Sequence, residues 1–167
     1  VFIIGCTFVQ CFLFGVFFHF HDALPKGEQY VKTEIPGSIS TKNMYTTVDK
    51  KEELEALGGY LTQNHLTEKK VLLYGEIPAI SYIFDMEPAV YTTWADLRSN
   101  TLERLQADLD AITTDYPVVI VTDAIGQELS GNTSYVDEKL DAIAQFLSRG
   151  NYQCGYAQKG YYVYTSQ

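Results

Sequence analysis

The sequence predicts an α/β fold, namely a small three-layer, Rossmann-like or flavodoxin-like domain with a mainly parallel sheet, preceded by one transmembrane helix. Three observations lead to this prediction. Apolar runs at residues 71–74 and 118–121 are typical of strands that are buried on both faces, and residues 89–93 are expected to form a further strand between them in the sequence. Amphipathic stretches with helical spacing separate these runs. Finally, a long apolar segment without charged side chains opens the chain.

The opening segment, residues 1–20, has no charged side chain before Asp22. At about 1.5 Å of rise per residue, a helix of this length matches a hydrocarbon core of roughly 30 Å. A secretory signal peptide would carry a basic region and a small-residue cleavage site, and neither is present. A buried core helix is the other alternative, but phenylalanine side chains would face all round it. We therefore expect a transmembrane helix, belonging to a longer protein with further spans upstream.

Residues 21–48 are expected to form an extended connector. They contain prolines and glycines, followed by a Ser/Thr/Asn-rich run from Ser38 to Thr47. Only Lys26 and Lys32 follow the apolar segment closely, which is sparse for a cytoplasmic flank. The α/β domain, predicted at residues 49–167, is therefore expected to be extracytoplasmic and attached to the cell membrane.

The composition limits the classes of partner. Hydrophobic residues make up 46% of the chain, which is enough for a substantial core. With 12 basic and 21 acidic residues, the net charge is −9, which argues against nucleic acid and anionic membrane surfaces as partners of the globular part. The three cysteines have neither zinc-site spacing nor a disulfide framework. No metal and no cofactor is predicted.

Helices are expected from about Lys50 to Asn64, from Asn100 to Ile112 and from Val136 to Arg149, with a short one after Pro78. Asp49 with Glu52, and Asn100 with Glu103, fit the spacing of a capping box. A polar loop is expected from Gly126 to Tyr135. The C-terminal residues predict an antiparallel hairpin that turns at Gln158-Lys159-Gly160.

Ligands of parallel α/β sheets bind outside the carboxyl ends of the strands. Five residues are expected there and are predicted to line a ligand-binding edge: Tyr74, Glu76, Trp94, Asp96 and Asp123. Their three carboxylates could hold a hard cation or the hydroxyl groups of a sugar, and the neighbouring aromatic ring favours the hydroxyl-rich ligand. The structural alternative is that Asp96 caps a turn, Asp123 forms an Asx turn and Trp94 closes the core.

No catalytic residue is predicted. The glycine patterns GxGxxG and GxxxxGK[ST], which cradle phosphates, are absent from the sequence. Ser81 lacks the GxSxG context of a hydrolase nucleophile, and pairing it with His65 would be arbitrary.

The order of segments also suggests a family. An apolar segment runs into the connector motif Ile35-Pro36-Gly37-Ser38-Ile39-Ser40-Thr41, and a helix then precedes the turn Tyr74-Gly75-Glu76-Ile77-Pro78. From about Phe12 to Thr122, the chain resembles the C-terminal extracytoplasmic region of bacterial multi-pass glycosyltransferases. The class is dolichyl-phosphate-mannose–protein mannosyltransferase-like and uses polyprenyl-phosphate sugars. Its catalytic acid lies in an earlier loop that this sequence does not contain, so the resemblance implies topology and an accessory role.

The expected function is a non-catalytic accessory domain of a membrane glycosyltransferase that positions the acceptor or the lipid-linked sugar donor. Its expected partners are the bilayer, the remaining transmembrane part of the parent protein, and a polyprenyl-phosphate sugar or acceptor. A membrane-anchored ligand-binding or interaction module unrelated to sugar transfer is the alternative. A third hypothesis is a complete small enzyme that uses Glu76, Asp96 and Asp123.

Overall fold

The computed structural model describes residues 4–9, 31–34, 39–41, 44–131 and 135–167. The predicted transmembrane segment and the connector therefore lie largely outside the described residues. Among the helices that are described, none is both long enough and apolar enough to cross a membrane.

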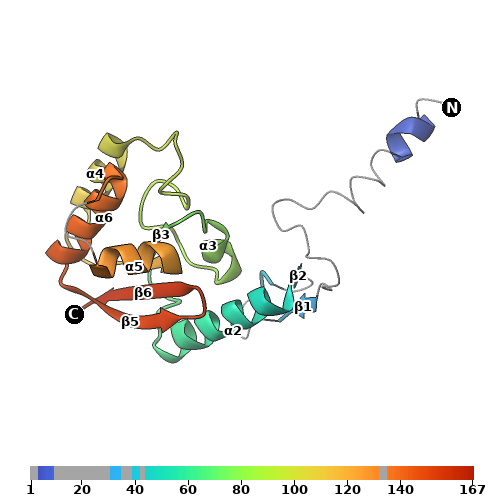
Figure 1. Ribbon diagram of the computed structural model, residues 1–167, viewed down its shortest axis with the longest axis horizontal. Helices are drawn as coiled ribbons and strands as arrows, with labels where there is room; N and C mark the ends of the chain where they lie inside the picture. The colour runs from blue at the N-terminus through green and yellow to red at the C-terminus, as the bar shows by residue number, and fades with distance from the viewer. Residues whose placement is uncertain (1–3, 10–30, 35–38, 42–43, 132–134) are drawn as a thin grey trace.

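The described chain is a mixed α/β structure (Figure 1). Its elements are β1 (Val31–Thr33), β2 (Met44–Thr46), α2 (Val48–Gln63), β3 (Val71–Tyr74), α3 (Ala79–Ile83), α4 (Leu102–Ala111), β4 (Val118–Thr122), α5 (Asp123–Gly131), α6 (Glu138–Arg149), β5 (Tyr152–Gln158) and β6 (Tyr161–Ser166). Strands β1 and β2 pair with each other in a separate antiparallel ribbon. The other four strands form one sheet in the order β3-β4-β6-β5.

The prediction of a mainly parallel sheet is wrong for the described strands. Only β3 and β4 are parallel, whereas β4–β6 and β5–β6 are antiparallel. The difference arises because residues 89–93 do not form a strand. A single parallel bridge joins Pro88 to Val71, and the backbone then leaves the sheet. The N–H of Ala89 still donates to the Val71 carbonyl at 2.8 Å, but that of Tyr91 donates to Oδ2 of Asp108 on α4, at 2.9 Å.

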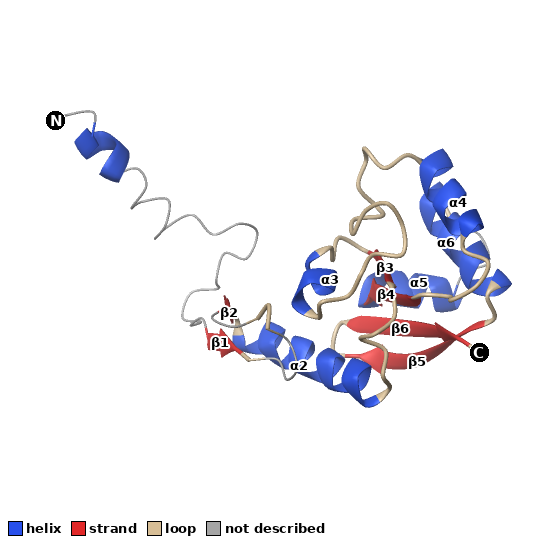
Figure 2. Ribbon diagram, turned by 180° about the vertical axis from the view of Figure 1, so that it is seen from behind, coloured by secondary structure: helices blue, strands red, loops and turns tan. Residues whose placement is uncertain are grey.

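Helices cover both faces of the sheet, as Figure 2 shows. Side chains alternate along β3, so Leu73 faces one side and Leu72 the other. The Leu73 side packs against α2 and α3, together with alternate residues of β4 and β6. The Leu72 side packs against α4 and α6, with partly buried residues of α5 beside them. Strand β3 and the first four residues of β4 are apolar because both of their faces are buried, whereas most residues of the edge strand β5 are exposed.

The predicted C-terminal hairpin is confirmed. Strands β5 and β6 pair up to Gln158 and Tyr161, and the two residues between them have φ angles of 50° at Lys159 and 80° at Gly160. Two left-handed residues in succession are what a type I′ hairpin turn requires. The Gly160 carbonyl also accepts the N–H of Asp123 at 2.9 Å, which joins the hairpin tip to the start of α5.

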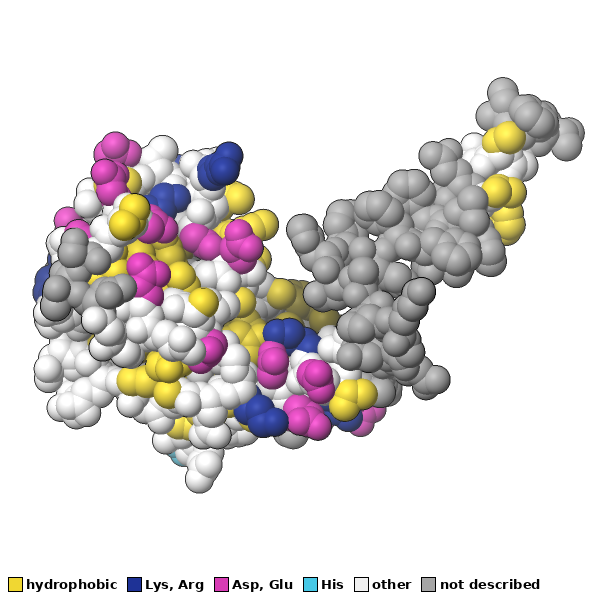
Figure 3. Space-filling model, viewed as in Figure 1, with side chains coloured by type: hydrophobic (Ala, Val, Ile, Leu, Met, Phe, Trp, Pro, Cys, Tyr) yellow, Lys and Arg dark blue, Asp and Glu magenta, His cyan; other side chains and the backbone are white. Residues whose placement is uncertain are grey.

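Threonine caps begin two of the helices, rather than the predicted acidic or amide residues. Thr47 caps α2 by accepting the N–H of Lys50, and Thr101 caps α4 by accepting the N–H of Arg104. Asn100 is instead buried and donates its amide N–H to the Ala95 carbonyl at 2.9 Å. The exposed face of α2 carries acidic and basic side chains side by side (Figure 3).

Helix α5 replaces most of the loop predicted from Gly126 to Tyr135. Gly126 is buried where α5 crosses β6, and a Cβ atom at this position would lie 2.3 Å from the ring of Tyr162. The glycine therefore marks close packing of a helix on a strand, although glycine among polar residues usually indicates a loop.

Candidate functional site

The chain turns sharply at the carboxyl end of β3. Gly75 has φ 107°, and a Cβ there would lie 2.5 Å from Oγ1 of Thr122 at the end of β4. The turn continues through Glu76 at φ 60°, a left-handed conformation that is rare for a residue with a side chain. Such backbone strain persists only where neighbouring groups hold it, and it is frequent at functional sites.

Asp96 holds this turn in place. Its Oδ2 atom accepts the backbone N–H of Glu76 at 2.7 Å, although the two residues are 20 positions apart. Asp96 is half-buried, and Trp94, two residues earlier, is 38% exposed. The loop is shaped locally, because the N–H of Trp94 donates to Oγ1 of Thr92 at 3.1 Å. Three of the five predicted residues, Glu76, Trp94 and Asp96, thus belong to one small region.

Tyr74 lies in the core rather than on this edge. It is 2% exposed, and its hydroxyl donates to Oδ2 of Asp137 at 2.7 Å. Burial, together with the Asp137 carboxylate, raises the pKa of Tyr74, so the phenol stays protonated as a donor. The other oxygen of Asp137 caps α6 by accepting the N–H of Lys139 at 2.9 Å. Tyr74 therefore joins β3 to the start of α6.

Asp123 starts α5 directly after β4. It is exposed, and its Oδ2 atom accepts the amide N–H of Gln127 one turn later at 2.6 Å. A carboxylate at the first turn of a helix is stabilised by the helix dipole. No group of three His, Cys, Asp or Glu side chains placed to hold a metal ion occurs in the described ranges. The three predicted carboxylates therefore do not form a metal centre there.

A cavity of about 310 Å³, which we call the β3 slot, opens beside Glu76. Figure 3 shows hydrophobic side chains gathered in this region between α3 and β2. The lining residues come from β2, α2, α3 and their flanking turns, plus the first residue of β6: Thr41, Met44, Tyr45, Thr46, Lys50, Leu54, Glu76, Ile77, Pro78, Ala79, Ile80, Ile83 and Tyr161. Apart from Glu76, none of them was predicted, because no local motif shows that such distant segments meet.

A smaller cavity, of about 120 Å³, lies beside the loop that carries Trp94 and is lined by Tyr91, Thr92, Leu97, Ser99, Asn100 and Arg104. The guanidinium carbon of Arg104 lies 3.4 Å from the ring centroid of Tyr91, in a cation–π contact. The buried Oδ1 atom of Asn100 has no hydrogen-bond partner among the described residues. This cavity thus combines hydroxyl groups, a guanidinium and an amide.

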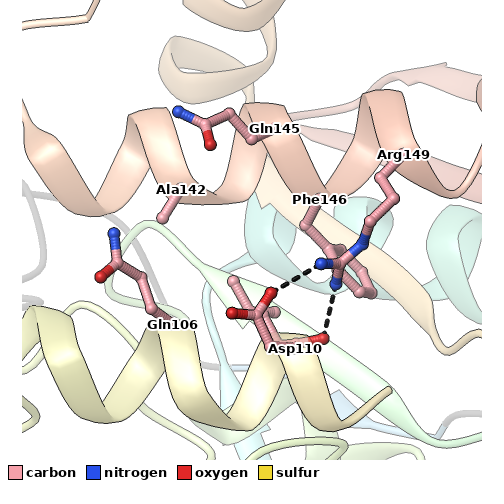
Figure 4. Close-up of a pocket in the computed structure, with 7 residues that line it drawn as sticks. Gln106, Asp110, Ala142, Gln145, Phe146 and Arg149 are labelled. Carbon is pink, nitrogen blue, oxygen red and sulfur yellow. Dashed lines mark hydrogen bonds and ion pairs between the residues drawn. The ribbon is translucent and has the colours of Figure 1, made fainter. Parts of the chain in front are cut away.

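The third cavity lies between α4 and α6, has a volume of about 480 Å³ and is shown in Figure 4. Its charged groups are already engaged. The Arg149 guanidinium pairs with Oδ1 of Asp110 at 2.6 Å and donates to the Leu109 carbonyl at 2.7 Å. These bonds join α6 to the end of α4, so we interpret this groove as part of the helix packing.

The carboxyl end of β3 is therefore the best candidate site. It brings together the Glu76–Asp96 contact, an exposed Trp94 and the mouth of the β3 slot. Comparison with protein-family models, curated proteins and solved structures finds no match to this chain.

Proposed function

We propose that the globular part of this chain is a non-catalytic, extracytoplasmic accessory domain of a membrane glycosyltransferase, which positions the acceptor or the lipid-linked sugar donor. The observation that carries the proposal is the contact between Glu76 and Asp96 beside the exposed ring of Trp94. The membrane anchor and the sugar-transfer context rest on the apolar segment at residues 1–20 and on the family resemblance. The parallel β3–β4 pair, with helices on both sides, supports a Rossmann-like core whose ligand lies at the strand ends.

The chemistry of the edge suits a hydroxyl-rich ligand. Asp96 supplies carboxylate oxygen as an acceptor, and Arg104 and Thr92, in the adjacent small cavity, supply donors. The ring of Trp94 offers an apolar face of the kind that packs against a sugar ring. Because the net charge of −9 disfavours an anionic group, we expect this edge to bind sugar hydroxyls rather than the phosphate of a lipid-linked donor.

The positions of Ser81 and His65 are compatible with a binding role. Ser81 is buried, and its hydroxyl donates to the Pro78 carbonyl at 3.1 Å, within the turn that starts α3. His65 lies in the exposed turn after α2, at φ 54°. A binding domain needs neither residue for proton transfer.

The test uses the full-length parent enzyme in membranes. Trp94→Ala or Asp96→Ala is expected to raise the KM for the acceptor more than it lowers kcat, as for an interaction present already in the ground state. Glu68→Ala, which changes an exposed carboxylate in the turn before β3, is the matched control and should leave both constants unchanged.

The third hypothesis, a complete small enzyme, predicts a different result. Residues 44–167 alone would then transfer or hydrolyse polyprenyl-phosphate sugars in the presence of a divalent metal, and Asp96→Ala would abolish the turnover. That outcome would replace the accessory role with a catalytic one.

The alternative of a membrane-anchored binding module uses the same edge but requires no transferase. It predicts a parent protein with a single membrane span, whereas the accessory role predicts several spans upstream of Val1. Reading the parent gene upstream of this sequence distinguishes the two.

A further inference from the structure

The β3 slot has an apolar interior. Leu54 of α2, together with Ile80 and Ile83 of α3, is buried in the core cluster and also lines the slot. Met44 and Tyr45 of β2 line it too, but remain exposed. A mainly apolar, partly open cavity with a few polar groups is the usual form of a small-molecule site, and about 310 Å³ lies at the lower end of the usual range.

Lys50, which lines the slot, is already paired with a carboxylate. The ammonium group of Lys50 pairs with Oε2 of Glu53 at 2.6 Å and lies 5.5 Å from the ring centroid of Tyr161. Glu76 adds one carboxylate to the lining. An anionic ligand group would gain little here, because Lys50 is already paired and Glu76 adds a negative charge. The part of a ligand that enters the slot should therefore be uncharged and apolar.

Two features identify the ligand class. First, Glu76 belongs both to the slot and to the contact with Asp96, so a molecule in the slot can extend directly to the hydroxyl-binding edge. Second, the wall formed by β2 belongs to the connector, which follows the segment predicted to lie in the membrane. We propose that the β3 slot binds the hydrocarbon chain of a membrane lipid whose hydroxylated head lies at the edge formed by Glu76, Trp94 and Asp96. This inference rests on the proposed function and narrows it to a lipid ligand.

The experiment measures how the alkyl length of a maleimide affects the rate at which it labels a thiol in the slot. It uses the full chain in amphipol, with Cys6, Cys11 and Cys154 replaced by serine. A thiol is introduced in the slot by Ala79→Cys and, as a matched control, on the open face of α4 by Ala107→Cys; both alanines are exposed. Each variant reacts with N-octylmaleimide and with N-ethylmaleimide. We expect the ratio of octyl to ethyl labelling rates to be at least about tenfold higher at position 79, because only there does a longer chain gain apolar contact. Partitioning of the octyl reagent into amphipol affects both positions alike.

A filling variant and competitors complete the test. Adding Thr46→Phe, which places a ring in the slot, should abolish the preference at position 79. Octanol and octyl glucoside should slow labelling at position 79, whereas methyl glucoside should not. Equal rate ratios at the two positions would overturn the inference. So would protection by peptides with apolar side chains but not by octanol, because the slot would then serve a protein partner.

The proposed function has a separate readout in the same samples. Trp94 is the single tryptophan of the chain, so its fluorescence reports on the hydroxyl-binding edge. A response to methyl glucoside without chain-length preference at position 79 would reject the lipid slot and keep the hydroxyl-binding edge. Preference at position 79 with no Trp94 response to either glucoside would keep an apolar slot but reject the proposed function.

Discussion

Replacing Glu76 with glycine should stabilise the protein, although it deletes a side chain from the candidate site. Glu76 adopts φ 60°, and a left-handed conformation costs a residue with a Cβ atom about 1–2 kcal/mol. Glycine avoids that cost but loses about 0.5–1 kcal/mol through the greater freedom of the unfolded chain. The Glu76 side chain is exposed, and the backbone bond to Asp96 is kept. The net expectation is a gain of about 0.5–1 kcal/mol in the free energy of unfolding.

The measurement is urea denaturation of residues 44–167, with the parent and variant compared at equal m-values. Glu87→Gly is the control, because Glu87 is also an exposed loop glutamate but does not have a positive φ. That variant should lose about 0.5–1 kcal/mol, so the two glycine variants should change stability in opposite directions. If both variants lose stability by the same amount, the turn is not strained and the reasoning fails.

Three further predictions concern residues 44–167. The fragment should show mixed α/β circular dichroism and melt cooperatively, and Leu73→Asp should abolish folding by burying an unpaired charge in β3; a variant that melts like the parent would refute the architecture. Tyr74→Phe should cost about 1.5–3 kcal/mol, because a hydrogen bond to a charged group is lost, and a double-mutant cycle with Asp137→Ala should show strong coupling; additive effects would disprove the contact. The raised pKa of Tyr74, caused first by burial, means that its stabilising contribution is complete below pH 10 and is lost as the pH rises further, by about 1.4 kcal/mol per pH unit. Tyr74→Phe should flatten this alkaline loss in denaturation measurements, and an unchanged pH profile would contradict the assignment.

The sequence correctly predicted the strands and helices in which buried residues follow a regular spacing. The apolar runs of β3 and β4 and the spacing of the leucines in α4 leave little choice of structure, since the strands are covered on both faces. Residues 89–93 were also predicted as a strand, but the backbone leaves the sheet after Ala89, and the N–H of Tyr91 donates to the carboxylate of Asp108 instead. A contact between a loop and a distant helix produces no periodic pattern in the sequence, so it could not be predicted.

The candidate site was predicted in part. The rule that strand ends meet at one edge brought Glu76 and Asp96 together correctly, although Asp96 reaches the edge on a loop rather than at the end of a strand. The same rule placed Tyr74 on the edge, whereas its side chain points into the core, as alternation along β3 requires. The β3 slot could not be predicted, because its walls come from segments that are separated by most of the domain.

The position of β6 has a consequence for synthesis on the ribosome. β6 ends at Ser166, yet it lies between β4 and β5, inside the sheet. Translation proceeds at about 5–20 residues per second, so β3 and β4 emerge several seconds before the strand that completes their sheet. Throughout that interval, the apolar residues of β4 lack their neighbour on one side. The nascent chain is then open to pairing with another chain at this edge, and binding by a chaperone would be most valuable at that stage.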